Sequence, residues 1–424
     1  MFTAITERVT VLGNRKTIII GGGAGGLMAG IFSAENGNDT IIVEKNKRPG
    51  RKLYITGKGR CNVCNNCDER TVIANTPTNG KFLYSALSNF SPSDTISFFE
   101  KHGCPLKTER GSRVFPVSDR AGDIVDTLVR AVNESGCTIV NDEVTDIFIE
   151  DGRVKGIVLS DGNIMECDKL IIATGGRSYP LTGSTGDGYT FAKKAGHTIV
   201  PLKPSLVPLI TAEPIDSEAD KLLIKNAALT VYDMKNGGRR IYSDFGELQF
   251  MNYGLSGAVI LSASAHLREM ESGRYRISID LKPALSEEKL DARLLRETGA
   301  RHTETMPQLM RSLLPAGMVG MFVRMSGVPA SRKCSELTRT ERRRIAALLK
   351  DFSLTIEGFR PIEEAIVTSG GVSVKEIDPR TMESRLVRGL YFAGEVIDVD
   401  AYTGGFNLQC AFSTGALAGS GNGG

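Results

Sequence analysis

Apolar residues near the N-terminus follow a pattern typical of a strand, a helix and a second strand. Residues 17–20 form a short apolar run that ends in glycines, residues 27–35 have helical periodicity, and residues 40–43 form another short apolar run. Short apolar runs of this kind predict strands buried on both faces, and two parallel strands need a crossover connection between them. The segment 17–43 therefore predicts one βαβ unit.

Further along the chain the pattern divides into strand-rich and helical stretches. Alternating apolar positions and turn signals over residues 136–170 predict a β-meander, which leads into an apolar run and glycines at 170–176. A strand-rich stretch follows over residues 226–282. Helical periodicity is present at residues 286–299, 304–314 and 339–350 and, after a strand-like segment at 389–397, in a run of small residues at 407–418.

These patterns predict a nucleotide-binding α/β domain made from both ends of the chain, with the middle third inserted. Three prolines between residues 200 and 208 are typical of an exit from the first domain. The predicted parts are an N-terminal extension (1–15), the first part of the nucleotide-binding domain (16–200), an inserted domain (201–355) with a β-rich part (205–282) and a helical part (283–350), and the second part of the nucleotide-binding domain (356–424).

The glycines after the first strand match the G-x-G-x-x-G fingerprint of a dinucleotide-binding turn through Gly21, Gly23 and Gly26. The first glycine allows a tight turn, the second lets the backbone approach a diphosphate, and the third allows the helix to pack closely on the strand. N–H groups at the start of the helix bind the anion. Glu44, after the next strand, can accept hydrogen bonds from ribose hydroxyls and would repel a 2′-phosphate, so the segment predicts NAD or FAD rather than NADP.

A second glycine-bearing strand end, at residues 389–405, favours FAD over NAD. A flavin needs acceptors for its ribityl hydroxyls and a positive field near its N1 and C2=O atoms. The start of the helix that follows Gly404 and Gly405 can supply that field. Glu395 and Asp398 are candidate ribityl acceptors, and their alternative role is that of a helix cap or a turn acid.

Charge and composition narrow the range of partners. The 424-residue chain has 52 Lys and Arg against 49 Asp and Glu, a net charge of +3, which predicts no basic field for nucleic acid. The run Arg342, Arg343 and Arg344 is interpreted as the solvated face of a helix. No apolar run approaches the roughly 18 residues of a membrane span, and no apolar block of a signal peptide is present at the N-terminus. We therefore expect a cytoplasmic protein with neither a membrane nor a nucleic acid as partner.

Cys61, Cys64 and Cys67 have a C-x2-C-x2-C spacing that is also found in metal sites. No further cysteine or histidine follows within thirty residues, so we expect no metal and interpret Cys61 as a loop residue beside the cofactor. A redox pair between two of these thiols stays open as an alternative. The four histidines are expected to pack or to lie on the surface. Tyr402 is a candidate proton donor, and its alternative role is packing under the flavin ring.

Six longer segments carry a family resemblance. They are GGGAGGLMAG (21–30), GRKLYITGKGRCN (50–62), RVFPVSDRA (113–121), ATGGRSYPLTGSTGDGY (173–189), PSLVPL (204–209) and the block 368–419. Together they resemble a bacterial flavoprotein family described as 3-dehydro-bile-acid Δ4,6-reductase-like or as aminoacetone-oxidase-type. The segment 245–257 departs from the family pattern at Gln249, Met251 and Asn252, which bears on the substrate and not on the cofactor.

The resemblance implies a two-dinucleotide-binding-domain flavoprotein fold, in which a Rossmann-like FAD domain is interrupted by a β-barrel-like and helical insertion. It also implies non-covalent FAD and a set of contact residues. These are Gly23, Ala24 and Gly25 at the diphosphate, Glu44 and Lys45 at the adenosine ribose, Arg51, Lys52, Gly59, Arg60, Cys61 and Asn62 along the next loop, Val144 at the adenine through its backbone, Thr174 and Gly175, and Gly394, Glu395, Asp398, Gly404, Gly405, Phe406 and Asn407 at the ribityl chain and isoalloxazine.

The expected chemistry is hydride transfer through the flavin. The chain has no second G-x-G-x-x-G at the start of a βαβ unit, because the glycines at 183–189 are spaced differently. A separate nicotinamide-binding domain is therefore not predicted, and NAD(P)H is expected to dock transiently. The family resemblance implies an NAD(P)H-driven reductase of an activated C=C bond in an apolar, carbonyl-bearing small molecule. The alternatives are an amine or aminoketone oxidase that uses O2, and a flavin-bearing redox-sensing or binding module. The sequence does not predict the oligomeric state.

Overall fold

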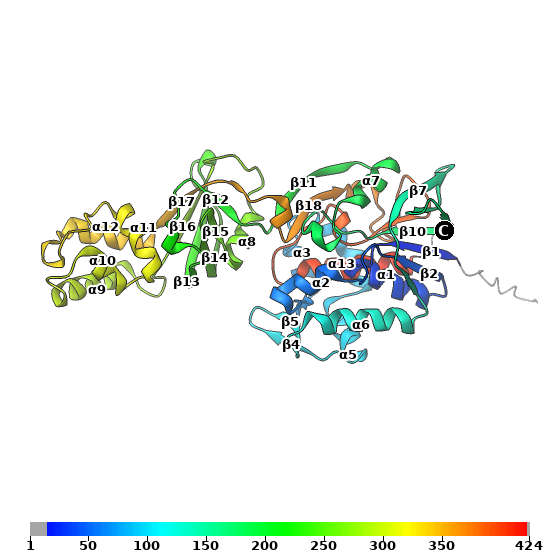
Figure 1. The fold of residues 1–424 in the computed structure, drawn as a ribbon, viewed down its shortest axis with the longest axis horizontal. Helices are drawn as coiled ribbons and strands as arrows, with labels where there is room; N and C mark the ends of the chain where they lie inside the picture. Colours follow the sequence, from blue (N-terminus) through cyan, green and yellow to red (C-terminus); the bar gives the residue numbers. More distant parts are fainter. Residues whose placement is uncertain (1–14, 422–424) are drawn as a thin grey trace, which may run out of the picture. The chain divides into compact units, whose positions relative to one another are not determined.

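The structure is a computed structural model that describes residues 15–421. The chain forms two compact units (Figure 1). Unit 1 combines the chain up to Lys203 with the chain from Val367 onward, and unit 2 consists of Pro204–Ile366. The predicted extension at residues 1–15 lies outside the described residues except for residue 15.

A five-stranded parallel sheet is the centre of unit 1. Its strand order is β19-β10-β1-β2-β6, with the strands β1 (Lys16–Ile20), β2 (Asp39–Val43), β6 (Thr138–Val140), β10 (Lys169–Ile172) and β19 (Leu390–Phe392). The first βαβ unit and the C-terminal strand therefore share one sheet. This is the parallel α/β architecture that the sequence predicts, and the strands are mainly apolar because both faces of such a sheet are covered.

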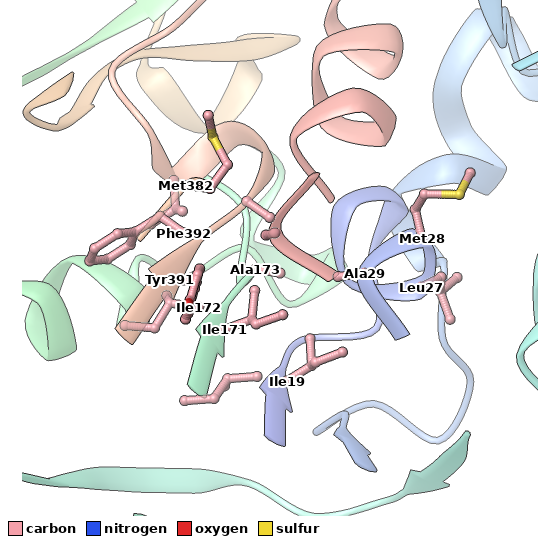
Figure 2. Close-up of a cluster of buried hydrophobic side chains, with 14 of the residues drawn as sticks. Ile19, Leu27, Met28, Ala29, Ile171, Ile172, Ala173, Met382, Tyr391 and Phe392 are labelled. Carbon is pink, nitrogen blue, oxygen red and sulfur yellow. The ribbon is translucent and has the colours of Figure 1, made fainter. Parts of the chain in front are cut away.

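Two helices follow strands β1 and β19 and pack against each other. They are α1 (Ala24–Glu35) and α13 (Phe406–Ser420). A Cβ atom at Gly415 would collide with the Gly25 carbonyl oxygen, so the two backbones approach each other at this point as only glycine permits. The surrounding core contains Ile19 of β1, Ile171 of β10 and Tyr391 of β19, all fully buried or nearly so (Figure 2).

Smaller elements complete unit 1. The predicted meander is present as the antiparallel sheet β7 (Val144–Glu150), β8 (Arg153–Leu159) and β9 (Ile164–Glu166). Two further small sheets are β3 (Cys64–Asn65), β5 (Arg113–Pro116) and β4 (Leu106–Glu109), and β11 (Ile199–Ser205) with β18 (Val367–Val372). The remaining helices are α2 (Arg51–Ile55), α3 (Glu69–Ala74), α4 (Tyr84–Asn89), α5 (Pro92–Lys101), α6 (Ala121–Glu134) and α7 (Asp187–Lys194).

Unit 2 consists of a closed barrel and of helices that lie between its strands along the chain, most of them before the last strand. The barrel has the order β12-β15-β14-β13-β16-β17, with β12 (Leu209–Thr211), β13 (Leu223–Asp233), β14 (Arg239–Met251), β15 (Gly254–Ser256), β16 (Tyr275–Asp280) and β17 (Phe352–Phe359). Its helices are α8 (Ala258–Ser264), α9 (Glu287–Ala300), α10 (Met306–Arg311), α11 (Val319–Ser326) and α12 (Arg339–Lys350). Barrel and helices share one hydrophobic core, which includes Phe250, Phe322 and Phe352.

The end of the inserted domain differs from the sequence prediction. We predict the return to the nucleotide-binding domain at residue 356, but the structure keeps the chain in unit 2 up to Ile366. The reason is β17, which pairs with β16 on one side and with β12 on the other and so closes the barrel. The alternation of apolar and polar residues shows that this segment is a strand, but not which sheet it joins.

Helix boundaries differ by a few residues. The first helix begins at Ala24 rather than at the predicted residue 27, because the glycines of the fingerprint form its first turn. The predicted helix 304–314 is shorter, as α10 ends at Arg311. Among the described residues, no helix has both the length and the apolar character that a membrane crossing requires.

Candidate cofactor site

The turn after β1 is built on two glycines that no other residue can replace without strain. Gly21 has φ +101°, and a Cβ atom there would lie 2.8 Å from the Ala173 carbonyl oxygen. A Cβ atom at Gly26 would collide with the Gly21 carbonyl oxygen. The Gly21 N–H donates to the Val43 carbonyl at 2.9 Å, which holds the turn at the carboxyl edge of the sheet. This is the tight geometry that the fingerprint predicts.

Gly23, by contrast, faces open space. It is the N-cap of α1, and no side chain caps the helix. A Cβ atom at Gly23 would have no atom within 4 Å, whereas at Gly25 it would lie 3.3 Å from the Gly394 nitrogen. The first turn of α1 carries no acidic residue. The N–H groups at this uncapped helix start are therefore oriented to bind an anion such as a diphosphate.

Glu44 binds the turn itself. The buried carboxylate accepts hydrogen bonds from the Gly22 N–H at 2.6 Å, from the Asn46 N–H at 2.8 Å and from the Asn46 side-chain amide at 2.6 Å. A carboxylate has about four acceptor positions, so Glu44 keeps capacity for one more donor, such as a ribose hydroxyl. Lys45 bonds the Thr185 hydroxyl at 2.6 Å and pairs with Asp187.

The loop between α2 and β3 has an unusual backbone. Positive φ angles between +57° and +84° occur at Gly57, Lys58, Gly59 and Cys61, in a region that residues other than glycine rarely adopt. Asn62 follows, and its Oδ1 atom is buried with no hydrogen-bond partner among the described residues. A buried acceptor without a donor is costly, and a bound group with an N–H or O–H would satisfy it.

The other predicted residues of this loop face different partners. Cys61 is fully buried, and burial raises the pKa of its thiol to about 12, so it is not a thiolate near neutral pH. Arg60 pairs with Glu109 and Asp119, and its guanidinium lies 4.1 Å from the centre of the Phe115 ring. The Arg51 side chain is exposed and donates to Asn46 at 3.0 Å.

Lys52 and Glu395 form a polar network with two residues that the sequence analysis missed. The Lys52 ammonium lies 2.6 Å from Glu395 Oε2 and 2.7 Å from the Ser178 hydroxyl. Glu395 Oε1 accepts from the Thr368 N–H at 2.8 Å and from Ser178 at 3.1 Å. Ser178 and Thr368 lie 190 residues apart in the sequence, and neither belongs to a motif that identifies this role.

The start of α13 is held close to β3. Gly404 and Gly405 have φ of +128° and +96°, and a Cβ atom at Gly405 would collide with the Cys64 backbone. Asn65 donates to the Gly404 carbonyl at 3.1 Å. Asn407 accepts from the Ala401 N–H at 2.9 Å and donates to the Ala401 carbonyl at 2.8 Å, which fixes the loop before the helix. Like α1, α13 has no side-chain cap and no acid in its first turn.

The remaining predicted contacts lie around these elements. Phe406 and Asp398 are buried, and Asp398 accepts from the Asn79 amide at 2.9 Å. The Gly394 N–H donates to Thr414 at 3.0 Å. Ala24 lies at the start of α1 and Val144 at the start of β7. The Thr174 hydroxyl is buried with no hydrogen-bond partner among the described residues, and Gly175 has φ +76°. Tyr402 is half-buried, and its N–H donates to the Asn75 carbonyl at 2.9 Å.

These features fit an elongated dinucleotide. Gly21, Ala173 and Ala393 directly follow β1, β10 and β19, so their turns meet at the carboxyl edge of the parallel sheet, where such folds bind nucleotides. A bound FAD would occupy the open space beside the Gly23 backbone, and it would supply a hydrogen-bond donor to the buried Asn62 Oδ1 atom. In the part of the chain that the structure describes, no three His, Cys, Asp or Glu side chains gather as a metal site would require.

Comparison with known proteins gives one family and several relatives. The family model "HI0933-like protein Rossmann domain" matches residues 15–421. A 3-dehydro-bile acid delta(4,6)-reductase of Clostridium scindens is 31% identical over 416 residues, covering 95% of this chain and 97% of that protein. A ribosomal RNA dihydrouridine synthase of Escherichia coli is 31% identical over 399 residues, covering 94% and 95%.

One solved structure is similar to this chain over nearly its whole length. A 3-ketosteroid delta1-dehydrogenase from Sterolibacterium denitrificans has a TM-score of 0.50 with 13% identity, covering 96% of this chain and 99% of that one. At this identity the likeness concerns the fold alone.

Proposed function

We propose that this chain, which belongs to the HI0933-like Rossmann-domain family, is an NAD(P)H-driven reductase of a C=C bond conjugated to a carbonyl group. Membership of this family of FAD-dependent oxidoreductases confirms the resemblance seen in the sequence. The reductant, the type of bond reduced and the contact residues are parts of the proposal.

The observation that carries the proposal is the chemistry shared by two relatives named for different substrates. One name denotes reduction of double bonds in a 3-oxo bile acid, and the other denotes formation of dihydrouridine. Dihydrouridine is uridine with its ring C=C bond, which is conjugated to a carbonyl, reduced. In both cases, addition of a hydride to the carbon remote from the carbonyl and of a proton to the other carbon would give the saturated product. Both relatives match nearly the whole chain at the same identity, so the common reaction is the one we assign.

FAD, when bound, accepts a hydride from NAD(P)H and passes it to the substrate. The residues of this chain bind and orient the cofactor. N–H groups at Gly23 and at the starts of α1 and α13 would face its diphosphate and its flavin end, and Asn62 would accept a hydrogen bond from it. The Lys52–Glu395 pair would place fixed charges at the flavin end, and the Ser178 hydroxyl would hold the Lys52 ammonium in position. Cys61, buried and protonated, contributes packing rather than redox chemistry.

The test is anaerobic spectroscopy of the FAD-loaded protein. We expect NADH or NADPH to bleach the flavin absorbance, and an α,β-unsaturated steroid ketone or a uridine-containing RNA to restore it with formation of the saturated product. Bleaching by an amine and rapid reoxidation by O2 alone would instead support the oxidase alternative. A flavin that no nicotinamide reduces would refute the proposal and favour a sensing or binding role.

A further inference from the structure

Positive charge is concentrated in the helical part of unit 2. Residues 283–350 contain ten arginines and three lysines against seven acidic residues, a net charge of +6, whereas the whole chain has +3. The rest of the protein is therefore net negative. The expectation of no nucleic-acid partner rests on the net charge of the whole chain, and that sum does not show how positive and negative charges are distributed between its parts.

Most acidic residues of these helices are already paired. Glu297 and Glu304 bind Arg301, Glu341 lies 3.2 Å from Arg332, and Glu287 and Glu288 lie in the first turn of α9. Several exposed basic side chains form no ion pair with any residue in the described range 15–421. These are Lys289, Arg296, Arg311, Lys333, Arg339, Arg343 and Arg344.

Three arginines lie close together on α12, and one of them pairs with a carboxylate of α9. Arg342 donates to both oxygens of Asp291, at 2.7 and 3.2 Å. Arg339 lies three residues before Arg342 and four before Arg343, so these side chains are neighbours on the surface of α12. One carboxylate balances one of them, so this α12 arginine cluster (Arg339, Arg342 and Arg343) keeps an excess of two positive charges on an exposed face.

We infer that the α12 arginine cluster binds the phosphate backbone of a structured RNA and so holds an RNA substrate on the enzyme. The inference rests on the proposed function, in which a uridine of RNA is one of the two substrates considered. Guanidinium groups bind phosphates through paired, charge-assisted hydrogen bonds, and contacts of this kind position a protein on a nucleic acid. A net charge of +6 on one helical subdomain also attracts a polyanion from a distance.

The same surface does not fit a lipid bilayer. A helix that binds a membrane surface places apolar side chains beside its cations. In α12 the apolar side chains Ile345, Ala346 and Leu349 are buried in the core of unit 2. Of the large apolar residues in α9–α12, Leu295 is the one that is strongly exposed in the described structure. The cluster is therefore a charged surface without the apolar component that insertion needs.

The test compares two double variants of the FAD-loaded full chain. R339Q/R343Q removes two arginines that make no ion pair, and R239Q/R240Q removes two exposed arginines of β14 in the same unit. Binding of a fluorescently labelled RNA stem-loop is measured by anisotropy between 50 and 200 mM salt. We expect R339Q/R343Q to bind at least about tenfold more weakly, with the slope of log affinity against log salt smaller by about two. The β14 variant should stay within about twofold of the wild type.

Three results would overturn the inference. They are absence of RNA binding by the wild-type protein, an equal loss of affinity in both variants, and displacement of RNA by polyglutamate of equal charge, which would indicate an acidic protein as partner. Circular dichroism of each variant checks that the fold is intact. Reduction of the wild-type flavin by NADPH is recorded separately, so failure of the proposed function is distinguished from failure of RNA binding.

Discussion

Replacing Gly23 by alanine should separate cofactor binding from folding. A Cβ atom at this position meets no atom within 4 Å, and the backbone has φ −83° and ψ −169°, which alanine adopts without strain. The protein without cofactor should therefore fold normally. Alanine restricts the unfolded chain more than glycine does but is a poorer N-cap residue, and since these effects oppose each other the free energy of unfolding should stay within about 1 kcal/mol of the wild type.

The same methyl group would occupy the space in which we place the diphosphate. Displacing one phosphate oxygen from the N–H groups of α1 loses a charge-assisted hydrogen bond, worth about 1.5 to 3 kcal/mol. This corresponds to FAD binding that is roughly 10- to 150-fold weaker. The assay is titration of the FAD-free protein with FAD, followed by flavin fluorescence, together with thermal unfolding of the FAD-free protein.

Gly299→Ala is the matched control. Gly299 lies in α9 of unit 2, and a Cβ atom there also meets nothing within 4 Å. It should leave FAD affinity unchanged. If Gly23→Ala binds FAD as tightly as the wild type, the diphosphate does not lie against this helix start, and the reasoning about the site fails.

Three further expectations concern packing, proton transfer and pH. Gly415→Ala should lower the thermal midpoint and weaken FAD binding, because its methyl would collide with the Gly25 carbonyl and force α1 and α13 apart at a cost of about 1 to 3 kcal/mol. Tyr402→Phe should keep kcat within about threefold, as expected of a packing residue, whereas a proton donor would contribute roughly a hundredfold or more. Burial, with a smaller effect of Arg268, lowers the pKa of His266 from 6.5 to about 4. Between pH 6.5 and 4 this imidazole is protonated in the unfolded chain but not in the folded one. The free energy of unfolding of unit 2 should therefore fall by up to about 3 kcal/mol as the pH is lowered from 6.5 to 4, measured by urea unfolding followed by circular dichroism.

Each of these expectations has a clear counter-result. An unchanged midpoint for Gly415→Ala would mean that the helices separate at little cost. A kcat loss above tenfold with intact FAD binding would make Tyr402 a catalytic residue. His266→Gln should flatten the acid side of the stability profile, and an unaltered profile would assign the effect to other groups.

The sequence predicted the parts of the site that depend on local pattern. The turn through Gly21, Gly23 and Gly26 follows from spacing within six residues, and the structure shows why Gly21 and Gly26 cannot be other residues. The partners of Lys45 and Glu395 could not be predicted in this way. Lys45 pairs with Asp187, 142 residues away, because α7 folds back beside the turn.

Non-local pairing also explains the misplaced domain boundary. The strand β17 has the same alternating pattern whether it joins the nucleotide domain or the barrel, and only its pairing with β12 and β16 decides. Ser178, in a loop, and Thr368, in β18, were missed for the same reason, since a short polar residue carries no signal of the distant carboxylate that it will bind. Local chemistry was readable from the sequence, whereas contacts between distant segments were not.

The position of β19 has a consequence for how the chain is made. β10 lies between β1 and β19, and residues 170–172 are fully buried there. At 5 to 20 residues per second, a ribosome needs about 10 to 45 s to pass from β10 to β19. During that interval the apolar edge of β10 has no neighbour on one side and is open to pairing with other nascent chains. Truncated products that stop before β19 should therefore aggregate, and newborn chains should depend on chaperones until translation reaches the last strand.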